Sequence, residues 1–521
     1  MNIARILSTI AEERPKETAI IESARGRERK TSFGELEIAA RCAAAMLAAD
    51  GLRAGDHALI LQPMSAQLYV ALLAVFRLGA IAMVLDPSAG PKHVERCCTI
   101  QPPKALIASK RAHWLRLWIS GLRKIPLKYS IGGRFLFTRR WERFLKFHPN
   151  ASMHACDLDT PALLTFTSGS TAQPKAAVRS HGLLLAQRTA LKEALNLEPG
   201  QGDLTTLPIF LLANLASGVC SIIPCADLRK VGQIDPVPVV RQIETGQPQS
   251  TVASPAFLER LADHCITNRI ILWSFQRIFT GGAPVFPKLM RKLKQMAPQS
   301  QIIAVYGSTE AEPIAHIGFD EMTDADFAAM QNGKGLFAGV PVPQINLKIL
   351  RQQWGRPIAD YSESNFAKDC QPANQPGEIV VHGDHVLRGY LNGIGDQETK
   401  FRVGSRVWHR TGDAGYLDDR GRLWLLGRCE ARIEDNRGEL YPFAVECAAQ
   451  EHPAVRRAAL VAVGGQRILA IECSEEMNMA ELQKSLAWAQ LDSIRNLKDI
   501  PVDKRHNAKV DYPELRRLME R

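Results

Sequence analysis

The sequence lacks the features that mark several classes of protein. Its 521 residues contain no Cys-x-x-Cys pair and no zinc-finger spacing, and its 11 cysteines are an odd number. Cys97 and Cys98 are adjacent and cannot easily bridge each other. The cysteines therefore indicate the reduced thiols of a cytosolic protein and exclude a disulfide framework. The absence of any zinc-finger or other nucleic-acid signature argues against a DNA or RNA partner.

Long hydrophobic runs and targeting segments are absent as well. Glu12, Glu13 and Arg14 interrupt any signal-peptide core near the N-terminus. The most apolar stretch, 68–85, contains Arg77 and several small residues. It predicts a helix followed by a buried strand better than a membrane span. We therefore expect a cytoplasmic protein, with no internal repeat and no low-complexity linker.

What the sequence does contain is typical of a large globular protein. Hydrophobic residues make up 46% and charged residues 23%. Single cores stop growing near roughly 250–300 residues, so two or more domains are expected. The net charge of +11, from 65 basic and 54 acidic side chains, suits anionic partners such as nucleotides, CoA, nucleic acid or acidic lipid. Charge alone does not choose among them.

Helix and strand patterns alternate in the N-terminal part of the chain. Residues 35–49 and 67–78 have helical patterns, and residues 57–61 and 80–85 read as short strands. This alternation predicts an α/β fold with a mostly parallel sheet covered by helices. Further strands are expected at 163–166, 302–306, 378–381 and 423–426. The segment after Gly427-Arg428 has its own strand-and-helix pattern and is long enough for a small separate domain.

Residues 109–147 differ from their surroundings, because basic and aromatic side chains alternate there. The basic residues are Lys110, Arg111, Arg116, Arg123, Lys124, Lys128, Arg134, Arg139, Arg140, Arg143 and Lys146, and the aromatic ones Trp114, Trp118, Phe135, Phe137, Trp141, Phe144 and Phe147. Such a composition suits an interfacial membrane surface. The alternative, which the sequence favours, is an insertion packed on the main domain with a solvated basic face.

A candidate phosphate loop follows the strand at 163–166. It reads Thr167-Ser168-Gly169-Ser170-Thr171-Ala172-Gln173-Pro174-Lys175. Small side chains let backbone N–H groups reach phosphate oxygens, hydroxyls donate further hydrogen bonds, and a lysine adds a point charge. The loop is not a Walker A motif, because Pro174 and Ala176 flank the lysine where glycine and Ser or Thr are needed.

At this loop the chain resembles the acyl-adenylate-forming superfamily of acyl-CoA synthetases, peptide-synthetase adenylation domains and luciferases. The family's loop reads Thr-Ser-Gly-Ser/Thr-Thr-Gly-x-Pro-Lys, and Ala172 stands where glycine is usual. An alanine there is costly if the position needs a positive φ. The resemblance covers nearly the whole chain. It implies an N-terminal AMP-binding domain (1–427), a hinge (428–432) and a small mobile α+β domain (433–521), with the active site between the domains.

Two further strings match the nucleotide side of the family's site. Tyr306-Gly307-Ser308-Thr309-Glu310 is similar to its next signature, and Gly281-Gly282-Ala283-Pro284 resembles its adenine-side loop. The resemblance implies that Gly282, Ala283, Pro284, Tyr306 and Gly307 belong to the ATP site, with Tyr306 against the adenine. It also implies that Thr309 contacts phosphate and that Glu310 binds Mg²⁺, a hard cation that prefers carboxylate oxygens.

The ribose and hinge signatures follow in the family's order. Arg410-Thr411-Gly412-Asp413 and Gly427-Arg428 match the ribose-binding signature. By resemblance, Asp413 accepts hydrogen bonds from both ribose hydroxyls, Arg428 contacts ribose or phosphate, and Glu430 is the hinge residue. Lys509, in Arg505-His506-Asn507-Ala508-Lys509, occupies the place of the catalytic lysine, where most members read Gly-Lys. It would bridge the substrate carboxylate and the α-phosphate.

Finer features resemble one branch, the β-lactone synthetases of bacterial olefin biosynthesis and their fatty-acid–CoA-ligase-like relatives. These features are Leu85 to Gly90, Tyr306 to Pro313, Gly438 to Pro442 and Pro501 to Lys509. The segment 208–214 lacks the histidine of many acyl-CoA synthetases. We expect Phe210, Leu211 and Asn214 in this segment to line an apolar acyl pocket, although such a run is also typical of a core helix.

The sequence thus predicts an AMP-forming enzyme that uses ATP and Mg²⁺ to activate a fatty or hydroxy-fatty acid and then transfers the acyl group to CoA. Three alternatives stay open. The adenylate of a β-hydroxy acid could close to a β-lactone without CoA, the acyl group could pass to an acyl-carrier protein, or the chain could be a non-catalytic nucleotide-binding homologue. No nucleic-acid partner is expected, and a peripheral membrane contact through 109–147 is the further partner considered.

Overall fold

The structure is a computed structural model, and it describes residues 1–24, 27–85, 89–167, 174–473, 477–503 and 509–520. These residues form two compact units. Unit 1 comprises Met1–Cys225, Gly246–Gln249 and Asp384–Asp396, and unit 2 comprises Ala226–Thr245, Ser250–Gly383 and Gln397–Arg521. Both units mix helices with sheets, so the predicted α/β class is confirmed. Among the described helices, none is both long enough and apolar enough to cross a membrane.

Unit 1 contains a seven-stranded sheet whose neighbouring strands are parallel except for the last pair. In spatial order the strands are β7 (Arg139–Arg140), β6 (Leu127–Ile131), β5 (Ala105–Ser109), β3 (His57–Leu61), β4 (Ile81–Val84), β8 (Pro161–Thr167) and β9 (Lys175–Ser180). The strands expected at 57–61, 80–85 and 163–166 are β3, β4 and β8, which confirms the parallel core predicted from the alternation.

Unit 1 also contains four strands from other parts of the chain, in the order β10 (Gly202–Thr205), β11 (Cys220–Ile222), β1 (Thr18–Ala24) and β2 (Arg27–Ser32). Its helices are α1 (Ala4–Glu13), α2 (Phe33–Ala49), α3 (Ala66–Arg77), α4 (Pro91–Ile100), α5 (Ser120–Lys124), α6 (His181–Ala194) and α7 (Pro208–Leu215). Helix α2 begins at a capping box, in which Ser32 Oγ accepts from Glu35 N and Glu35 Oε2 accepts from Ser32 N. Two backbone donors at the helix start are thereby satisfied.

The basic-aromatic segment 109–147 is part of this fold. Its strand β6 lies in the sheet between β5 and β7, so the segment is not an insertion packed on the outside. Tyr129, Trp141 and Phe144 are buried in the core of unit 1. Trp141 Nε1 donates to Gln67 Oε1 at 2.8 Å, which satisfies the polar end of the buried indole. Part of the aromatic content of this segment is therefore structural.

Unit 2 contains a long, mostly antiparallel sheet. In spatial order its strands are β17 (Asn346–Leu350), β18 (Gly377–His382), β20 (Arg406–Leu417), β21 (Leu423–Arg428), β16 (Leu336–Pro341), β15 (Ala311–Gly318), β14 (Gln301–Ser308), β13 (Arg277–Gly281) and β12 (Ser250–Ala253), and β19 (Lys400–Val403) pairs with β20. Only the β12–β13 and β13–β14 pairs of this series are parallel. The strands expected at 302–306, 378–381 and 423–426 are β14, β18 and β21.

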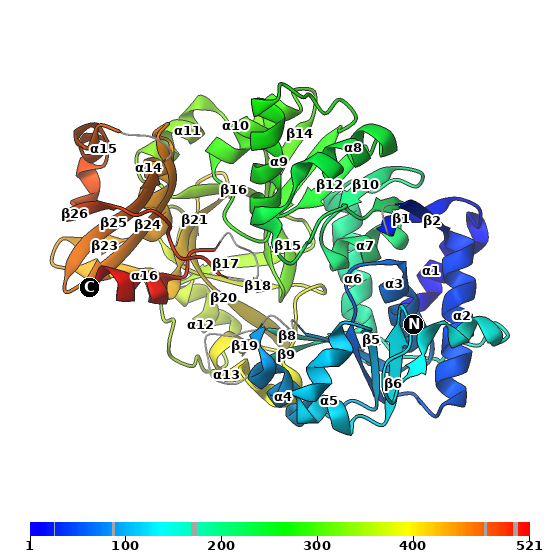
Figure 1. Ribbon diagram of the computed structural model, residues 1–521. Coiled ribbons are helices and arrows are strands. Elements are labelled where there is room, and N and C mark those ends of the chain that lie inside the picture. The colour runs from blue at the N-terminus through cyan, green and yellow to red at the C-terminus, as the bar shows by residue number, and fades with distance from the viewer. Residues whose placement is uncertain (25–26, 86–88, 168–173, 474–476, 504–508, 521) are drawn as a thin grey trace. The chain divides into compact units, whose positions relative to one another are not determined.

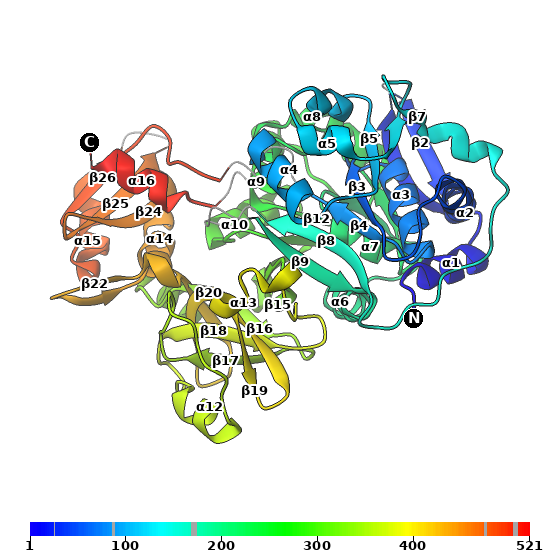
Figure 2. The ribbon, with the colours of Figure 1, turned by 90° about the horizontal axis from the view of Figure 1, so that it is seen from below.

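Helices cover this sheet and continue into the C-terminal part. They are α8 (Pro236–Gly246), α9 (Pro255–Thr267), α10 (Pro287–Met296), α11 (Asp324–Gln331), α12 (Glu363–Asp369), α13 (Asp396–Thr399), α14 (Pro442–Gln450), α15 (Met479–Ser485) and α16 (Tyr512–Met519). Helix α12 lies against β17 to β20 (Figure 2), where Phe366 packs with Phe401 and Trp408 in one apolar cluster.

The C-terminal part of unit 2 is a small α+β assembly, as predicted. It contains the hairpin β22 (Ile433–Asp435) and β23 (Gly438–Leu440), and the sheet of β24 (Val455–Val463), β25 (Gln466–Cys473) and β26 (Ser493–Asn496). Successive residues of β24 enter different cores, because side chains alternate across a strand. Leu460 packs in the cluster that contains Val445 of α14, and Val461 in the cluster that contains Leu515 of α16 (Figure 1).

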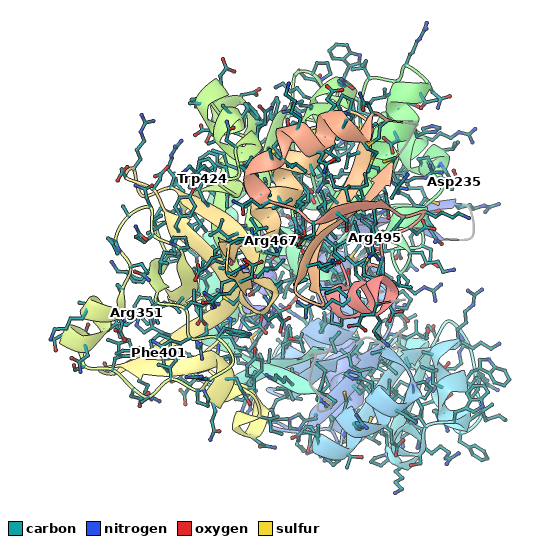
Figure 3. All side chains as sticks on the ribbon, turned by 90° about the vertical axis from the view of Figure 1, so that its left-hand side faces the viewer. Asp235, Arg351, Phe401, Trp424, Arg467 and Arg495 are labelled. Atoms are coloured by element: carbon teal, nitrogen blue, oxygen red, sulfur yellow. The ribbon has the colours of Figure 1, made fainter. Side chains whose placement is uncertain are left out.

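Arg467 joins the hairpin to the C-terminal sheet (Figure 3). Its Nε and Nη2 donate to Asp435 Oδ2 and Oδ1 at 2.9 and 2.7 Å, and its Nη1 donates to the Ala489 carbonyl at 3.0 Å. The guanidinium is almost fully buried, so the paired carboxylate and carbonyl replace the water it loses. The hairpin that follows the predicted hinge is therefore fixed to the small C-terminal assembly.

The buried carboxyl of Glu446 in α14 makes the stability of this assembly depend on pH. Its Oε1 accepts from Leu460 N at 2.9 Å and from Tyr512 Oη at 2.7 Å, and burial raises its pKa to about 7. Because the folded pKa lies above the usual value near 4.5, the cost of ionisation grows as pH rises through this range and is complete above pH 7. Glu446→Gln keeps the accepting oxygen, and we expect it to raise the free energy of unfolding at pH 8 by about 3 kcal/mol.

Thermal unfolding of the full chain between pH 4.5 and pH 8 measures this effect. The gain from Glu446→Gln should disappear at the acid end, where the wild-type carboxyl is already protonated. The exposed Glu481 of α15 provides the matched control, and Glu481→Gln should leave the profile unchanged. A Glu446→Gln profile that parallels the wild-type curve would contradict the assignment of this carboxyl.

All eleven cysteines lie in the described part of the chain and none is in a disulfide. Seven are buried and three are half-buried, whereas Cys225 is exposed. Burial raises the pKa of Cys97 and of Cys98 to about 12, so both thiols are protonated at neutral pH. The adjacent pair is therefore a structural part of the unit 1 core.

Candidate active site

The predicted adenine-side residues of unit 2 lie at the carboxyl ends of two parallel strands. Gly281, the last residue of β13, pairs with Val305 of β14. The loop 282–284 therefore starts beside Tyr306-Gly307, at the strand ends where open α/β sheets bind ligands. A Cβ on Gly281 would lie 2.5 Å from the Val305 carbonyl oxygen, so this close approach requires glycine. Gly282 is exposed, and its two successors are half-buried.

Thr309 and Glu310 occupy the turn of a β-hairpin. The sequence predicts a strand that ends in a loop, whereas in the structure β14 continues to Ser308 and pairs with Ala311 of β15. Glu310 N donates to Ser308 Oγ at 3.3 Å. The half-buried Glu310 offers oxygen ligands of the kind that suits Mg²⁺. Among the described residues no three His, Cys, Asp or Glu side chains form a metal-ligating group, so phosphate and water oxygens would complete the shell.

Asp413 is held at both carboxylate oxygens by residues of two other strands, β14 and β21. Tyr306 Oη donates to Oδ2 at 2.8 Å, and Arg428 Nη1 donates to Oδ1 at 3.0 Å. Asp413 of β20 is the register partner of Arg428 of β21. Each carboxylate oxygen can accept more than one hydrogen bond, so both can still accept from a ribose hydroxyl. The structure thus brings together three residues that the sequence assigns to nucleotide binding.

Charges at this cluster reinforce one another. The Asp413 carboxylate holds the pKa of Arg428 well above its ordinary value. Burial raises the pKa of Tyr306 far above 10, and the adjacent Asp413 raises it further. Tyr306 therefore remains a neutral hydrogen-bond donor at physiological pH, and Arg428 remains a cation. A fixed anion between two donors is suited to hold vicinal hydroxyls in one orientation.

A buried ion pair supports the strand that carries Asp413. Arg410 Nε and Nη2 donate to Glu378 Oε1 and Oε2, both at 2.7 Å, and both side chains are 0–1% exposed. Gly412, at φ +71°, separates this pair from Asp413, and a Cβ there would lie 2.8 Å from Arg428 Nη2. The segments that contain Glu378 and Arg410 can be recognised in the sequence. Their pairing across β18 and β20 cannot, because it depends on the order of the strands in the sheet.

Removing the Tyr306 hydroxyl tests this arrangement. Tyr306→Phe deletes the donor to Asp413 Oδ2. One hydrogen bond to a charged group is worth roughly 1.5–3 kcal/mol, so we expect the KM for ATP to rise about 10-fold or more with kcat nearly unchanged. Tyr416 provides a matched control, because its hydroxyl donates to the Lys334 carbonyl at 2.9 Å, away from Asp413. Steady-state kinetics in which both variants behave alike would contradict the role of Tyr306.

The phosphate-loop residues belong to unit 1. Thr167 is the last residue of β8 and pairs with Lys175, the first residue of β9. Ser168, Gly169, Ser170 and Thr171 lie outside the described residues. Lys175 Nζ lies 5.9 Å from the centre of the Tyr390 ring, a cation–π distance. Lys175 thus lies at the start of strand β9, directly after the loop, and beside an aromatic ring from a distant part of the chain.

The predicted hinge and catalytic lysine belong to unit 2. Glu430 is exposed in the 3₁₀ turn η7 (Cys429–Ala431), directly after β21. Lys509 is also exposed. Its backbone N donates to Asp503 Oδ1 at 3.0 Å, and Asp503 N donates to the Lys509 carbonyl at 2.8 Å. Residues 504–508 lie outside the described residues, and these two hydrogen bonds join the residues on either side of them.

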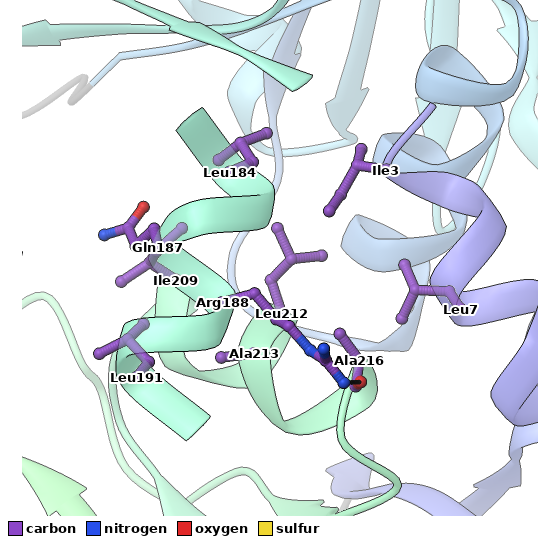
Figure 4. Close-up of a pocket in the computed structure, with 10 residues that line it drawn as sticks. All are labelled: Ile3, Leu7, Leu184, Gln187, Arg188, Leu191, Ile209, Leu212, Ala213 and Ala216. Carbon is purple, nitrogen blue, oxygen red and sulfur yellow. Dashed lines mark hydrogen bonds between the residues drawn. The ribbon is translucent and has the colours of Figure 1, made fainter. Parts of the chain in front are cut away.

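The three predicted acyl-pocket residues are buried in α7 of unit 1. Asn214 Nδ2 donates to Asp203 Oδ2, Thr205 Oγ1 and Ser221 Oγ, each at 3.1 Å, so its amide joins neighbouring strands. A small, mostly apolar cavity is lined by a different set of residues, which lie in or directly beside α1, α6 and α7 and are shown in Figure 4: Ile3, Leu7, Leu184, Gln187, Arg188, Leu191, Ile209, Leu212, Ala213 and Ala216. Neither Phe210, Leu211 nor Asn214 lines that cavity.

The amino-acid sequence of the chain is similar to those of known proteins. The family model described as AMP-binding enzyme matches residues 7–391. An olefin beta-lactone synthetase of Stenotrophomonas maltophilia is 30% identical over 547 aligned positions, which cover 99% of this chain and 97% of that protein. The 4-coumarate–CoA ligase-like 4 of Oryza sativa subsp. japonica is 26% identical, over 85% of this chain and 78% of the relative.

Solved structures share the fold. The anthranilate CoA ligase AuaEII, solved in complex with anthranoyl-AMP, superposes with a TM-score of 0.84 at 17% identity, over 99% of this chain and 97% of that chain. At this level of identity the likeness concerns the fold. It extends over both units and includes the small C-terminal assembly.

Proposed function

The chain belongs to the AMP-binding enzyme family and is an adenylate-forming ligase, and on that premise we propose that it converts a β-hydroxy fatty acid to a β-lactone through an acyl-adenylate. The observation that carries this proposal is the end-to-end match to an olefin beta-lactone synthetase, at 30% identity over 97% of that protein. The apolar character of 208–215, which has no ionisable side chain, suits an acyl chain rather than an amino acid.

The first step forms a bond between the substrate carboxylate and the α-phosphorus of ATP and releases pyrophosphate. Asp413, held by Tyr306 and Arg428, would orient the ribose, and the loop 282–284 would flank the adenine. Lys175 and Lys509 each supply a cation for phosphate or carboxylate oxygens, which is the electrostatic stabilisation such a transfer needs. Glu310 would hold Mg²⁺, which would neutralise phosphate charge.

In the second step the β-hydroxyl oxygen attacks the acyl carbon of the adenylate. The new C–O bond closes a four-membered ring, the bond between the acyl carbon and the AMP phosphate oxygen breaks to release AMP, and the hydroxyl proton passes to water. No thiol is needed. The second candidate is transfer of the acyl group to CoA, which is supported by the similarity to 4-coumarate–CoA ligases at 26% identity.

Product analysis by mass spectrometry distinguishes the two reactions. The protein is incubated with Mg-ATP and fatty acids of matched length, with or without a β-hydroxyl, in the presence and absence of CoA. The expected result is release of AMP together with a β-lactone, whose mass is that of the acid less one water. This product should form only from the acid with a β-hydroxyl, and it should form without CoA. An acyl-CoA product from both acids would establish the ligase instead, and AMP release that requires an added acyl-carrier protein would establish a third acceptor.

A further inference from the structure

The positive charge of the protein is concentrated in one segment of unit 1. Residues 109–147 contain eleven basic side chains and a single acidic one, Glu142, whereas the remainder of the chain has 54 basic and 53 acidic side chains. The segment thus accounts for nearly all of the net charge of +11. Such a local excess creates a field that attracts an anionic partner to one face of the molecule.

Large apolar side chains of the same segment are exposed. Trp114, Leu117 and Trp118 lie along the 3₁₀ turn η2 (Ala112–Leu117) and its end, at a spacing that places them on one side, and Trp118 is 69% exposed. In the loop between β6 and β7, Leu136 is 72% and Phe137 89% exposed. Soluble proteins rarely expose large apolar side chains in groups, so a group of five indicates a contact surface.

Specific contacts hold these side chains together as one surface, here called the η2 face: Trp114, Leu117, Trp118, Leu136 and Phe137. The ring of Trp114 meets Phe135 edge-on, at 5.2 Å between centroids. Arg116 Nη1 donates to the Leu136 carbonyl at 3.0 Å, and its guanidinium lies 5.9 Å from the centre of the Phe135 ring. Turn η2 and the β6–β7 loop are therefore fixed to each other.

The backbone of the loop is arranged so that its most exposed side chain faces solvent. Phe137 has φ +57°, in the left-handed region that bulky residues rarely adopt. Burial explains two other aromatic residues of the segment, Trp141 and Phe144, which pack in the core. It does not explain Phe137, whose strained backbone presents an apolar ring to water.

The basic residues near the η2 face differ from those farther along the segment. Arg139 and Arg143 form ion pairs with Asp50, at 2.7 and 3.3 Å, so their charges are paired within unit 1. The side chains of Lys110, Arg111, Arg123, Lys124 and Arg134 are exposed. No acidic residue occurs between Ser109 and Trp141. Cations therefore border a group of exposed tryptophan, leucine and phenylalanine side chains.

We propose that the η2 face docks on an anionic lipid surface, with the apolar side chains in the headgroup and upper acyl region and the basic side chains at the phosphates. Aromatic rings with adjoining cations suit this boundary, since the rings leave water while the charges remain hydrated. Basic clusters bind anionic leaflets by a field that decays within about a Debye length, roughly 8–10 Å. A nucleic acid would pair its phosphates with the basic side chains but would leave Leu136 and Phe137 in water.

Co-sedimentation with vesicles tests the proposal on the full chain. Vesicles of phosphatidylcholine alone and vesicles with 30 mol% phosphatidylglycerol (about one lipid in three, an anionic surface of the kind that attracts basic clusters) are compared at low and high salt. We expect at least about tenfold tighter binding to the anionic vesicles, weakened by salt. The double variant Trp118→Ser/Phe137→Ser should bind at least about tenfold more weakly, with ATP–pyrophosphate exchange unchanged.

Trp273 provides the matched control, because its side chain is also 69% exposed but lies in unit 2, outside the segment. Trp273→Ser should bind vesicles as the wild type does. The proposal is overturned if the wild type does not bind anionic vesicles, or if the double variant binds them fully. It is also overturned if Trp273→Ser and the double variant lose vesicle binding equally. A nucleic-acid surface is indicated instead if duplex DNA displaces the vesicles and the double variant binds both DNA and vesicles as the wild type does, and this result too overturns the proposal.

Discussion

Replacement of Lys509 by alanine is expected to lower acid-dependent ATP–pyrophosphate exchange at least about 100-fold, the loss typical for removal of one preorganised electrostatic contact in a transition state. The lysine is exposed in the structure, and its backbone N donates to Asp503 Oδ1. Its charge is therefore available for a bound carboxylate and phosphate. Conversion of chemically prepared acyl-adenylate to product should be largely retained, because that step needs no cation between carboxylate and α-phosphate.

The exposed Lys498 is the matched control for this variant, since it lies in the same C-terminal assembly but outside the signature. Lys498→Ala should retain both half-reactions. Lys509→Arg should restore only part of the exchange, because a planar guanidinium does not replace a compact ammonium. Equal loss of both half-reactions in Lys509→Ala would count against the proposed role of the small domain, which is to present this lysine for adenylation alone.

The second large effect concerns stability rather than chemistry. Arg410→Met leaves the fully buried Glu378 carboxylate without its partner, and breaking a buried ion pair in this way costs about 3–5 kcal/mol of unfolding free energy. The loss includes the two hydrogen bonds that Arg410 Nη1 donates to the carbonyls of Arg356 and Glu398. Hydrogen–deuterium exchange of the β18 and β20 amides should be accelerated accordingly.

Two controls separate charge from packing at this pair. Glu378→Met/Arg410→Met removes both charges, and it should recover much of the stability that the single variant loses. The pH dependence has a definite sign. Burial raises the pKa of Glu378, and without Arg410 it rises further, so the deficit of Arg410→Met should be largest at neutral pH and shrink as pH falls. A deficit under about 1 kcal/mol at neutral pH would show that the pair is not buried as a charged unit.

Much of the fold follows from local patterns. The helix expected at 35–49 is α2 and the strand at 57–61 is β3, because each has a clear period and a defined start or end. The short strand β6 within 109–147 does not follow from a local pattern, because basic residues surround and interrupt it. A five-residue strand with a lysine in it gives too weak a period to identify from sequence.

In the candidate site, the identities of the residues can be predicted from the sequence, whereas the contacts between them cannot. Individual residues such as Asp413 and Tyr306 are identified by their signatures, which the family resemblance supplies. Their hydrogen bond is not predictable, because β14 and β20 are far apart in the chain, and their places in the sheet, where three strands separate them, do not follow from the sequence. The Glu378–Arg410 pair is hidden for the same reason. Sequence names the parts of such a site, and topology decides which of them touch.

The burial of the thiols also makes the protein convenient for spectroscopy. Ten of the eleven cysteines are buried or half-buried, and Cys225 alone is exposed. A maleimide fluorophore should therefore react first at Cys225, since reaction needs an accessible thiolate. A second cysteine placed at the exposed Lys498 would give a donor–acceptor pair between unit 1 and the C-terminal assembly of unit 2. Energy transfer between the two dyes would then report whether the distance between these two positions changes when ATP and the acid bind, without first removing native cysteines.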